Sequence, residues 1–353
     1  MHLFRCSPRS FFSSRFSSSA AYAPSASTIA NRFLTKCQAA GPQTRTQALD
    51  ANQLQLFSLT LNRNHLYSNT PALSNAPAPP VGTPVPPGYH LVYFTPAFLE
   101  SELGSDGTDV SYNPDAPFTR RMWAGGEVQW PRAPDGRLNL LRVGQEVREM
   151  TKFLSAEAKV IKKTGEEMII VGLEKVFENE HGVALTDRRS WVFRPALKVP
   201  SPSEEPRSYP PLLTSKPPAP PSPSSPTTKV YTRNLRQTPE SLFRMSALTF
   251  NGHKIHYSVP WAREVEGHRG LVVHGPLNLV SILDFWRDAQ EHVNANPEDM
   301  LPLSISYRAT NPLYAGEEYQ ICLEMDGEYS KANIYNAEGV VCMKAEIKGP
   351  KID

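Results

Sequence analysis

The sequence contains few cysteines, no long apolar run and, over its first 49 residues, no acidic side chain. None of its four cysteines forms a CxxC pair, so neither a disulfide framework nor a zinc–thiolate site is predicted. No uninterrupted apolar stretch reaches the roughly 18 residues that a membrane-spanning helix needs. We therefore expect a protein without a membrane span whose core is held together by packing.

The acid-free N-terminus is rich in serine and contains six Lys and Arg residues before position 46. This composition is typical of a mitochondrial transit peptide, which we predict over residues 1–45, and it implies a location in the matrix. Without those six charges, 31 Lys and Arg face 35 Asp and Glu, a net charge of −4. The remaining chain lacks the basic excess that nucleic-acid binding requires, so no nucleic-acid partner is expected.

Proline-rich stretches at residues 71–88 and 200–226 divide the rest of the chain. Such segments carry too few apolar side chains to offset the entropy lost on ordering, which predicts extended or unfolded structure. We expect four parts: a disordered or proline-rich segment over 46–88, a first domain over 89–199, a linker over 200–226 and a second domain over 227–353.

Both predicted domains contain apolar runs separated by hairpin turns such as Asp326-Gly327. In the second domain, a nearly all-round apolar stretch over 276–293 precedes the runs and begins with Pro276, which indicates a buried helix. One helix followed by an antiparallel meander predicts an α+β fold whose sheet wraps around the helix. The predicted strands are 153–163, 167–179, 184–194, 303–310, 317–327, 329–339 and 340–349.

The string NGHKIH at residues 251–256 follows a short predicted helix that Thr238 would cap. We expect an exposed loop there, where functional residues concentrate. His253 and His256 lack the further Cys, Asp or Glu that would complete a metal site, so no metal is expected. A neutral imidazole can instead take up and return a proton near physiological pH, which favours a catalytic histidine.

A second string, GLVVHGPL at residues 270–277, leads from an apolar stretch into the predicted buried helix. The free N–H groups at a helix start favour developing negative charge, and Gly275 would let a substrate come close to them. Such amides can form an oxyanion hole. His274 and Val273 precede Gly275 and are predicted to line the same site.

These strings, together with FTRRMWAGGEVQW at 118–130 and LTDRRSWVFRP at 185–195, resemble the fungal mitochondrial hydroxyacyl-thioester dehydratase type 2 family, which is similar to MaoC-type hydratases. The resemblance implies a double hotdog: two antiparallel sheets, each wrapped on a helix, packed as an internal pseudo-dimer. It also implies that only the C-terminal half keeps a catalytic loop. The N-terminal half would shape the acyl tunnel.

The resemblance implies His256 as the acid–base residue and Asn251 at the position of the family's aspartate. His253, Val273, His274 and Gly275 would bind substrate. The implied activity is (3R)-3-hydroxyacyl-thioester dehydration in mitochondrial type II fatty acid synthesis. The acyl group would be carried on the phosphopantetheine of acyl carrier protein or on coenzyme A, without a further cofactor. A homodimer is a possible assembly.

Two alternatives stay open at this point. One is a hydratase of short branched dicarboxyl thioesters such as mesaconyl-C4-CoA, in which similar N-G-H-x-I-H strings occur. The other is a catalytically silent hotdog that binds acyl carriers as a scaffold, because the amide of Asn251 cannot exchange protons at neutral pH.

Overall fold

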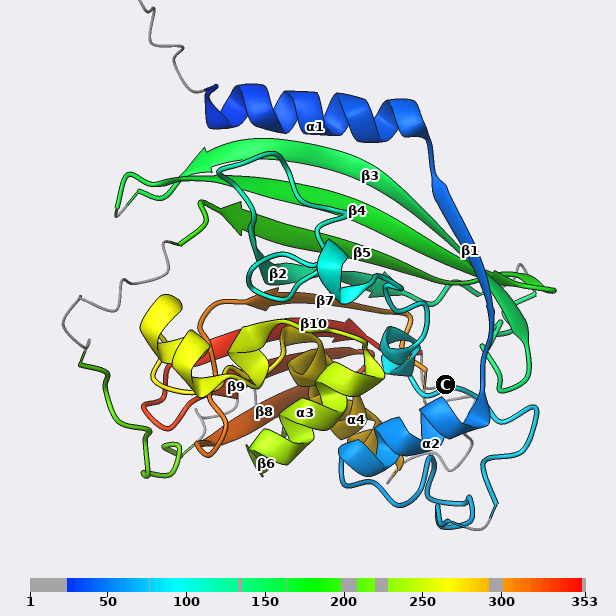
Figure 1. Cartoon of the computed structure of the whole chain (residues 1–353). Coiled ribbons are helices and arrows are strands. Elements are labelled where there is room, and N and C mark those ends of the chain that lie inside the picture. The colour runs from blue at the N-terminus through cyan, green and yellow to red at the C-terminus, as the bar shows by residue number, and fades with distance from the viewer. Residues whose placement is uncertain are drawn as a thin grey trace, which may run out of the picture.

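A computed structural model describes residues 24–75, 77–132, 135–162, 164–197, 208–219, 228–291 and 301–350. Ten described strands form one antiparallel sheet, shown in Figure 1. In spatial order the strands are β1 (Gln43–Ala48), β3 (Glu146–Val160), β4 (Glu167–Asn179), β5 (Gly182–Arg194), β2 (Arg120–Gln129), β7 (Ser304–Ala309), β10 (Val341–Lys348), β9 (Tyr329–Tyr335), β8 (Glu318–Asp326) and β6 (Lys229–Arg236).

The sheet consists of two halves with the same connectivity. The N-terminal half has the order β1-β3-β4-β5-β2, and the C-terminal half has the corresponding order β6-β8-β9-β10-β7. The halves join where β2 pairs with β7, with Gly126 opposite Tyr307. The α+β prediction is confirmed, and all seven predicted strands are present with ends shifted by a few residues. The two predicted sheets are continuous through this β2–β7 seam.

The described residues form four α-helices: α1 (Ala26–Ala40), α2 (Ala51–Thr60), α3 (Pro239–Leu248) and α4 (Gly275–Glu291). Of these, α1 packs on β3 and β4, α4 contacts β2 and β8, and α2 packs against α3. In the C-terminal half α4 is the helix that the sheet wraps, as predicted. The corresponding stretch of the N-terminal half, between β1 and β2, instead contains α2 and two 3-10 turns, Tyr89–Val92 and Glu100–Glu102. Figure 1 shows α1 lying along β3, away from α2, α3 and α4.

The prediction of a transit peptide ending at residue 45 is wrong in its boundary. Ser25 caps α1 by accepting a hydrogen bond from the Thr28 amide, and Ile29 and Phe33 of this helix are buried. The Phe33 ring meets Phe153 of β3 edge-on at 5.3 Å. β1 then pairs with β3, so removal of 45 residues would uncover the sheet. Residues 1–23 of the predicted presequence lie outside the described part of the chain.

Residues 46–88 are predicted as a disordered or proline-rich segment, and their described part contains the ordered helix α2. Asp50 caps α2 through the Gln53 amide, and Leu54 and Phe57 of that helix are fully buried. The proline-rich stretch that follows still contributes Val85 to the main core. Composition alone could not predict this packing, because a few apolar side chains are enough to order a segment when neighbouring elements supply the rest of the core.

The predicted linker over 200–226 is described only at 208–219, where the chain forms no helix or strand. This part lies on the C-terminal half, since the Leu213 amide donates to Glu317 Oε1 at 2.9 Å. The remaining residues of the linker prediction lie outside the described ranges.

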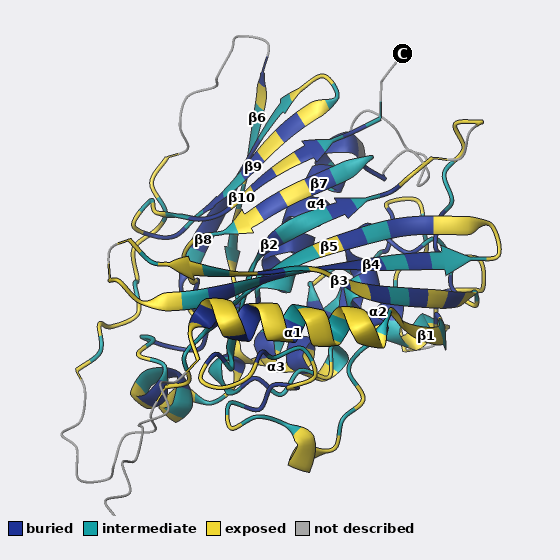
Figure 2. Cartoon of the chain, turned by 90° about the horizontal axis from the view of Figure 1, so that it is seen from above, coloured by how far each residue is buried: buried dark blue, intermediate teal, exposed yellow. Residues whose placement is uncertain are grey.

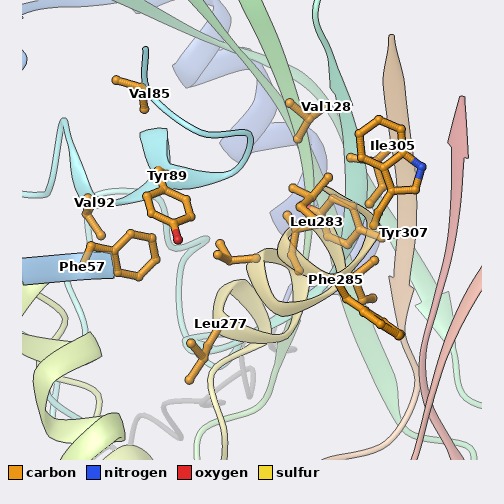
Figure 3. Close-up of a cluster of buried hydrophobic side chains, with 14 of the residues drawn as sticks. Phe57, Val85, Tyr89, Val92, Val128, Leu277, Leu283, Phe285, Ile305 and Tyr307 are labelled. Atoms are coloured by element: carbon orange, nitrogen blue, oxygen red, sulfur yellow. The ribbon is translucent and has the colours of Figure 1, made fainter. Parts of the chain in front are cut away.

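The two halves share one hydrophobic core around α4. Figure 2 shows α4 among the buried elements, and Leu277, Val280 and Leu283 are each at most 1% exposed. In Figure 3 the side chains of Phe57 and Tyr89 approach this helix from the N-terminal half, and the Tyr89 hydroxyl donates to Asp284 Oδ2 at 3.1 Å. Burying an aliphatic side chain such as Leu277 contributes about 1.5–3 kcal/mol to the free energy of unfolding. Side chains from both halves therefore hold α4 in place.

Candidate active site

The histidine segment follows α3, whose start is capped as predicted, with the Ser241 amide donating to Thr238 Oγ1 at 3.1 Å. Phe250 leaves the helix with a positive φ of 49°. Asn251 Oδ1 then accepts a hydrogen bond from the His253 amide at 3.1 Å, a turn that asparagine favours. The chain therefore reverses direction and enters a 3-10 turn over Lys254–His256.

The prediction that this segment is an exposed loop is wrong, because His253 and His256 are only 8% and 6% exposed. A segment of the N-terminal half, residues 103–110, which we call the covering loop, lies on it. The Lys254 amide donates to the Asp106 carbonyl at 2.8 Å, and Gly107 packs against the backbone of Gly252. The covering loop and the histidine segment are about 150 residues apart in the sequence, so no local pattern could predict their contact.

The ring of His256 is held in one tautomer. Its Nδ1 lies 2.7 Å from the Val272 carbonyl oxygen, which can only accept, so Nδ1 carries the hydrogen and Nε2 keeps a free lone pair. Burial, with a smaller effect of the neighbouring His253, lowers the pKa of His256 to about 3. The imidazole is therefore neutral at physiological pH and has the form that a general base requires.

The imidazole of His274 stacks on the ring of His256. The two imidazoles are stacked with centroids 3.5 Å apart and an interplanar angle of 17°. His274 Nε2 lies 2.9 Å from Ser246 Oγ, which ties it to α3. Burial keeps the pKa of His274 well below its usual range, so two stacked neutral rings avoid charge repulsion.

Gly275 is the first residue of α4, one position before the predicted start at Pro276. The preceding Val273 is anchored because its amide donates to the Leu313 carbonyl at 2.9 Å. A side chain at position 275 would place its Cβ 2.9 Å from Cδ1 of Trp123, so only glycine fits beneath this indole ring. Amides in the first turn of a helix have no partner within the helix, which leaves them available to an acyl oxygen.

All six predicted site residues line one cavity of about 800 Å³. They are Asn251, His253, His256, Val273, His274 and Gly275. The structure thus brings together the histidine segment and the start of α4, two strings that are separated by about 20 residues. The catalytic and binding roles of these residues stay predictions.

The N-terminal half forms the other wall of the cavity, and no site residue was predicted in this half from the sequence. Trp123 and Arg121 of β2 and Trp191 of β5 line the cavity. Arg121 Nη2 pairs with Asp109 of the covering loop at 2.7 Å, and its guanidinium lies 4.8 Å from the Trp191 ring centroid. Both tryptophans lie in the two N-terminal strings quoted for the family resemblance, which was the available signal.

Among the described residues, no group of three or more His, Cys, Asp or Glu side chains is placed to hold a metal ion. In the same part of the chain no helix is long and apolar enough to cross a membrane. What the cavity does hold is a neutral imidazole, helix-start amides and an aromatic wall, a combination suited to acid–base chemistry on an acyl group.

The sequence model of the family "hydroxyacyl-thioester dehydratase type 2" matches residues 88–315, which is more than half of the chain. The chain belongs to this family. Two curated relatives agree: a mesaconyl-C4-CoA hydratase of Chloroflexus aurantiacus is 28% identical over 77% of this chain and 86% of its own length. The mitochondrial hydroxyacyl-thioester dehydratase type 2 of Schizosaccharomyces pombe is 26% identical over 69% and 79%. Both names describe hydro-lyases, and this chain is a hydro-lyase of the same family.

Solved structures support the fold. A MaoC-like dehydratase of Phytophthora capsici has a TM-score of 0.58 at 14% identity, covering 88% of this chain and 96% of its own. A Mycobacterium tuberculosis protein described as a double hotdog has a TM-score of 0.52 at 14% identity, with coverages of 88% and 96%. The predicted double-hotdog fold is confirmed.

The buried histidines of this hydro-lyase predict acid lability. The folded pKa of His256 is about 3 against a usual 6.5, so between these values the unfolded chain binds more protons and the free energy of unfolding falls as pH falls. One such histidine contributes a slope of about 1.4 kcal/mol per pH unit. When the free energy of unfolding is measured with denaturant between pH 4.5 and 6, its slope against pH should be lower by about this amount in His256→Gln than in the wild type. The exposed-residue variant His181→Gln should keep the wild-type slope, and equal slopes in all three proteins would contradict the prediction.

Proposed function

We propose that this protein interconverts (3R)-3-hydroxyacyl and 2-enoyl thioesters in mitochondrial type II fatty acid synthesis. The observation that carries the proposal is the position of His256 on the same cavity as the start of α4. The imidazole keeps a free lone pair on Nε2, and the helix start offers amide hydrogens. These are the two groups that removal of an α-proton from a thioester needs.

The helix start polarises the thioester. The carbonyl oxygen would accept a hydrogen bond from the Gly275 amide, and the charge that develops on it as the α-proton leaves is stabilised by that donor and by the dipole of α4. A donor of this kind typically contributes about 3–4 kcal/mol in the transition state. Trp123 packs closely on Gly275 and lines the same cavity.

His256 moves the proton. In the dehydration direction its Nε2 takes the α-hydrogen, the bond between C3 and the hydroxyl oxygen breaks, and the same proton leaves with that oxygen as water. Hydration reverses each step, so the imidazole ends every cycle neutral. Asn251, at the position of the family's aspartate, contributes only hydrogen bonds because an amide does not exchange protons at neutral pH.

The proposal places the enzyme in the mitochondrial matrix with acyl carrier protein as the carrier of its substrate. Support comes from the basic, serine-rich start of the chain and from the Schizosaccharomyces pombe relative, whose name is mitochondrial. The chemistry needs no cofactor besides the phosphopantetheine or coenzyme A that carries the acyl group.

A second candidate is hydration of a short branched dicarboxyl thioester, as in the name of the Chloroflexus aurantiacus relative. One observation favours it. Arg121 on the cavity wall has its Nη1 buried without a hydrogen-bond partner among the described residues, and Asn251 is uncharged. Arg121 pairs with Asp109 through Nη2, so Nη1 is the arm of its guanidinium that would bind a carboxylate on the acyl group.

The two candidates are separated by a steady-state assay of the full chain on three thioesters: crotonyl, a long 2-enoyl and mesaconyl-C4. We expect kcat/KM for the linear 2-enoyl substrates to exceed that for the dicarboxyl substrate at least about tenfold, since one unpaired buried carboxylate costs more than 1.4 kcal/mol. The reverse preference would select the second candidate. Inactivity on all three would refute both.

A further inference from the structure

Asn251 leaves one part of the proposed reaction without a residue. The hydroxyl that departs from C3, or the water that attacks it, needs a group to hold its oxygen in line, and the amide oxygen of Asn251 is already engaged with the His253 amide. The imidazole of His253 is in contact with His256 and lines the same cavity.

We propose that His253, oriented by Asp106 of the N-terminal half, binds the departing 3-hydroxyl or the attacking water beside His256. This inference rests on the proposed function. It makes His253 a catalytic residue and Asp106 a positioning residue contributed by the half that has no catalytic loop of its own.

The two imidazoles lie side by side on the cavity wall. Their centroids are 5.4 Å apart and their planes are nearly perpendicular, at 83°, so the rings meet edge to face. The α-hydrogen and the 3-hydroxyl sit on adjacent carbon atoms, so a thioester lying across both rings can present its hydrogen to one and its oxygen to the other. His253 is nine-tenths buried, which removes competing bulk water from its side of the cavity.

The carboxylate of Asp106 lies near Nε2 of His253. Its Oδ2 lies 4.0 Å from His253 Nε2, which is buried and has no hydrogen-bond partner among the described residues. Its Oδ1 is fixed by the amide of Thr108 at 2.9 Å and by the hydroxyl of the same residue at 2.8 Å. The carboxylate is therefore held in place, and the remaining gap is of the kind that closes when a substrate binds.

The carboxylate selects the tautomer of His253. An acceptor beside Nε2 favours a hydrogen on that nitrogen, which leaves the Nδ1 lone pair for the substrate oxygen. Burial and the positive charges of Arg121 and Arg120 lower the pKa of His253 to about 3, so the ring accepts a hydrogen bond without becoming protonated.

The proton balance of the step is unchanged by this role. The 3-hydroxyl donates its hydrogen bond to His253 Nδ1, which turns a lone pair of the oxygen toward His256. The C3–O bond then breaks, the proton taken from C2 by His256 passes to that oxygen, and water leaves. His253 gains and loses no proton over the cycle.

The test compares two substrates that differ in their leaving group, 3-hydroxybutyryl and 3-chlorobutyryl thioesters. Chloride departs without a proton and without a hydrogen-bond acceptor. We expect His253→Phe to lower kcat for dehydration about 100-fold while chloride elimination changes less than about threefold. Asp106→Asn would place an amide donor beside Nε2 and favour the wrong tautomer, so it should show the same pattern with a loss of at least about tenfold.

A matched control is Asp115→Asn, which neutralises an exposed carboxylate paired with Arg32 and should leave both reactions at the wild-type rate. Equal losses for the two substrates would assign His253 and Asp106 a merely structural role and overturn the inference, and so would unchanged dehydration in both variants. If His253→Phe does not fold, Asp106→Asn decides alone, since its amide oxygen can keep the Thr108 contacts. A wild-type protein that processes neither thioester would refute the proposed function instead.

Discussion

Replacing His256 with alanine is expected to lower kcat for hydration of a 2-enoyl thioester by about 10³-fold, the range measured when a general acid–base residue is removed. The loss should fall on kcat rather than on KM, because the helix-start amides that hold the carbonyl remain. Steady-state kinetics on crotonyl thioester, together with a melting curve to verify folding, would measure it.

Two comparison variants sharpen this prediction. His256→Gln can still donate to the Val272 carbonyl and should be as inactive as the alanine variant, since a glutamine amide takes up no proton. His181→Ala changes a histidine whose side chain is 69% exposed and should retain full activity. Wild-type turnover in His256→Ala would remove His256 as the proposed base, whereas absence of turnover in the wild-type protein as well would favour the silent acyl-carrier scaffold.

Substituting Gly107 with alanine should lower kcat/KM by about 100-fold although this residue lies outside the cavity lining. A Cβ at this position would sit 2.1 Å from the carbonyl oxygen of Gly252, so the covering loop would have to lift from the histidine segment. Displacement of reacting groups by about 1 Å is enough for a loss of this size. Steady-state kinetics on the same thioester would measure the effect.

The matched control is Gly136→Ala. Gly136 has the same φ of +82° as Gly107, but nothing lies within 4 Å of a Cβ built on it. Both variants therefore carry the left-handed backbone strain of about 1–2 kcal/mol, but only the Gly107→Ala side chain would clash with the backbone of Gly252. Equal activity in the two variants would show that the covering loop does not position the site.

The sequence was most informative where local patterns decide structure. Alternating apolar residues and turns such as Asp326-Gly327 predicted the C-terminal meander, and Thr238 and Pro276 marked two helix starts that the structure confirms. The same reasoning found six of the residues with which the C-terminal half lines the cavity, since their strings flank α4 and α3.

Long-range packing decided what the sequence could not. Helix α1 has a composition like that of a transit peptide, and its packing on β3 and β4, more than 100 positions away, makes it part of the fold. Asp106 carries no local motif, and its position beside His253 follows from the way β2 joins β7. The exposed-loop prediction for residues 251–256 failed for the same reason.

The β2–β7 seam has a kinetic consequence. A hotdog site built between separate subunits exists only while they remain associated, whereas here the wall with Trp123 and the helix with Gly275 belong to one polypeptide. Formation of this reaction centre is unimolecular, so specific activity should hold constant on dilution to any concentration at which the chain itself stays folded.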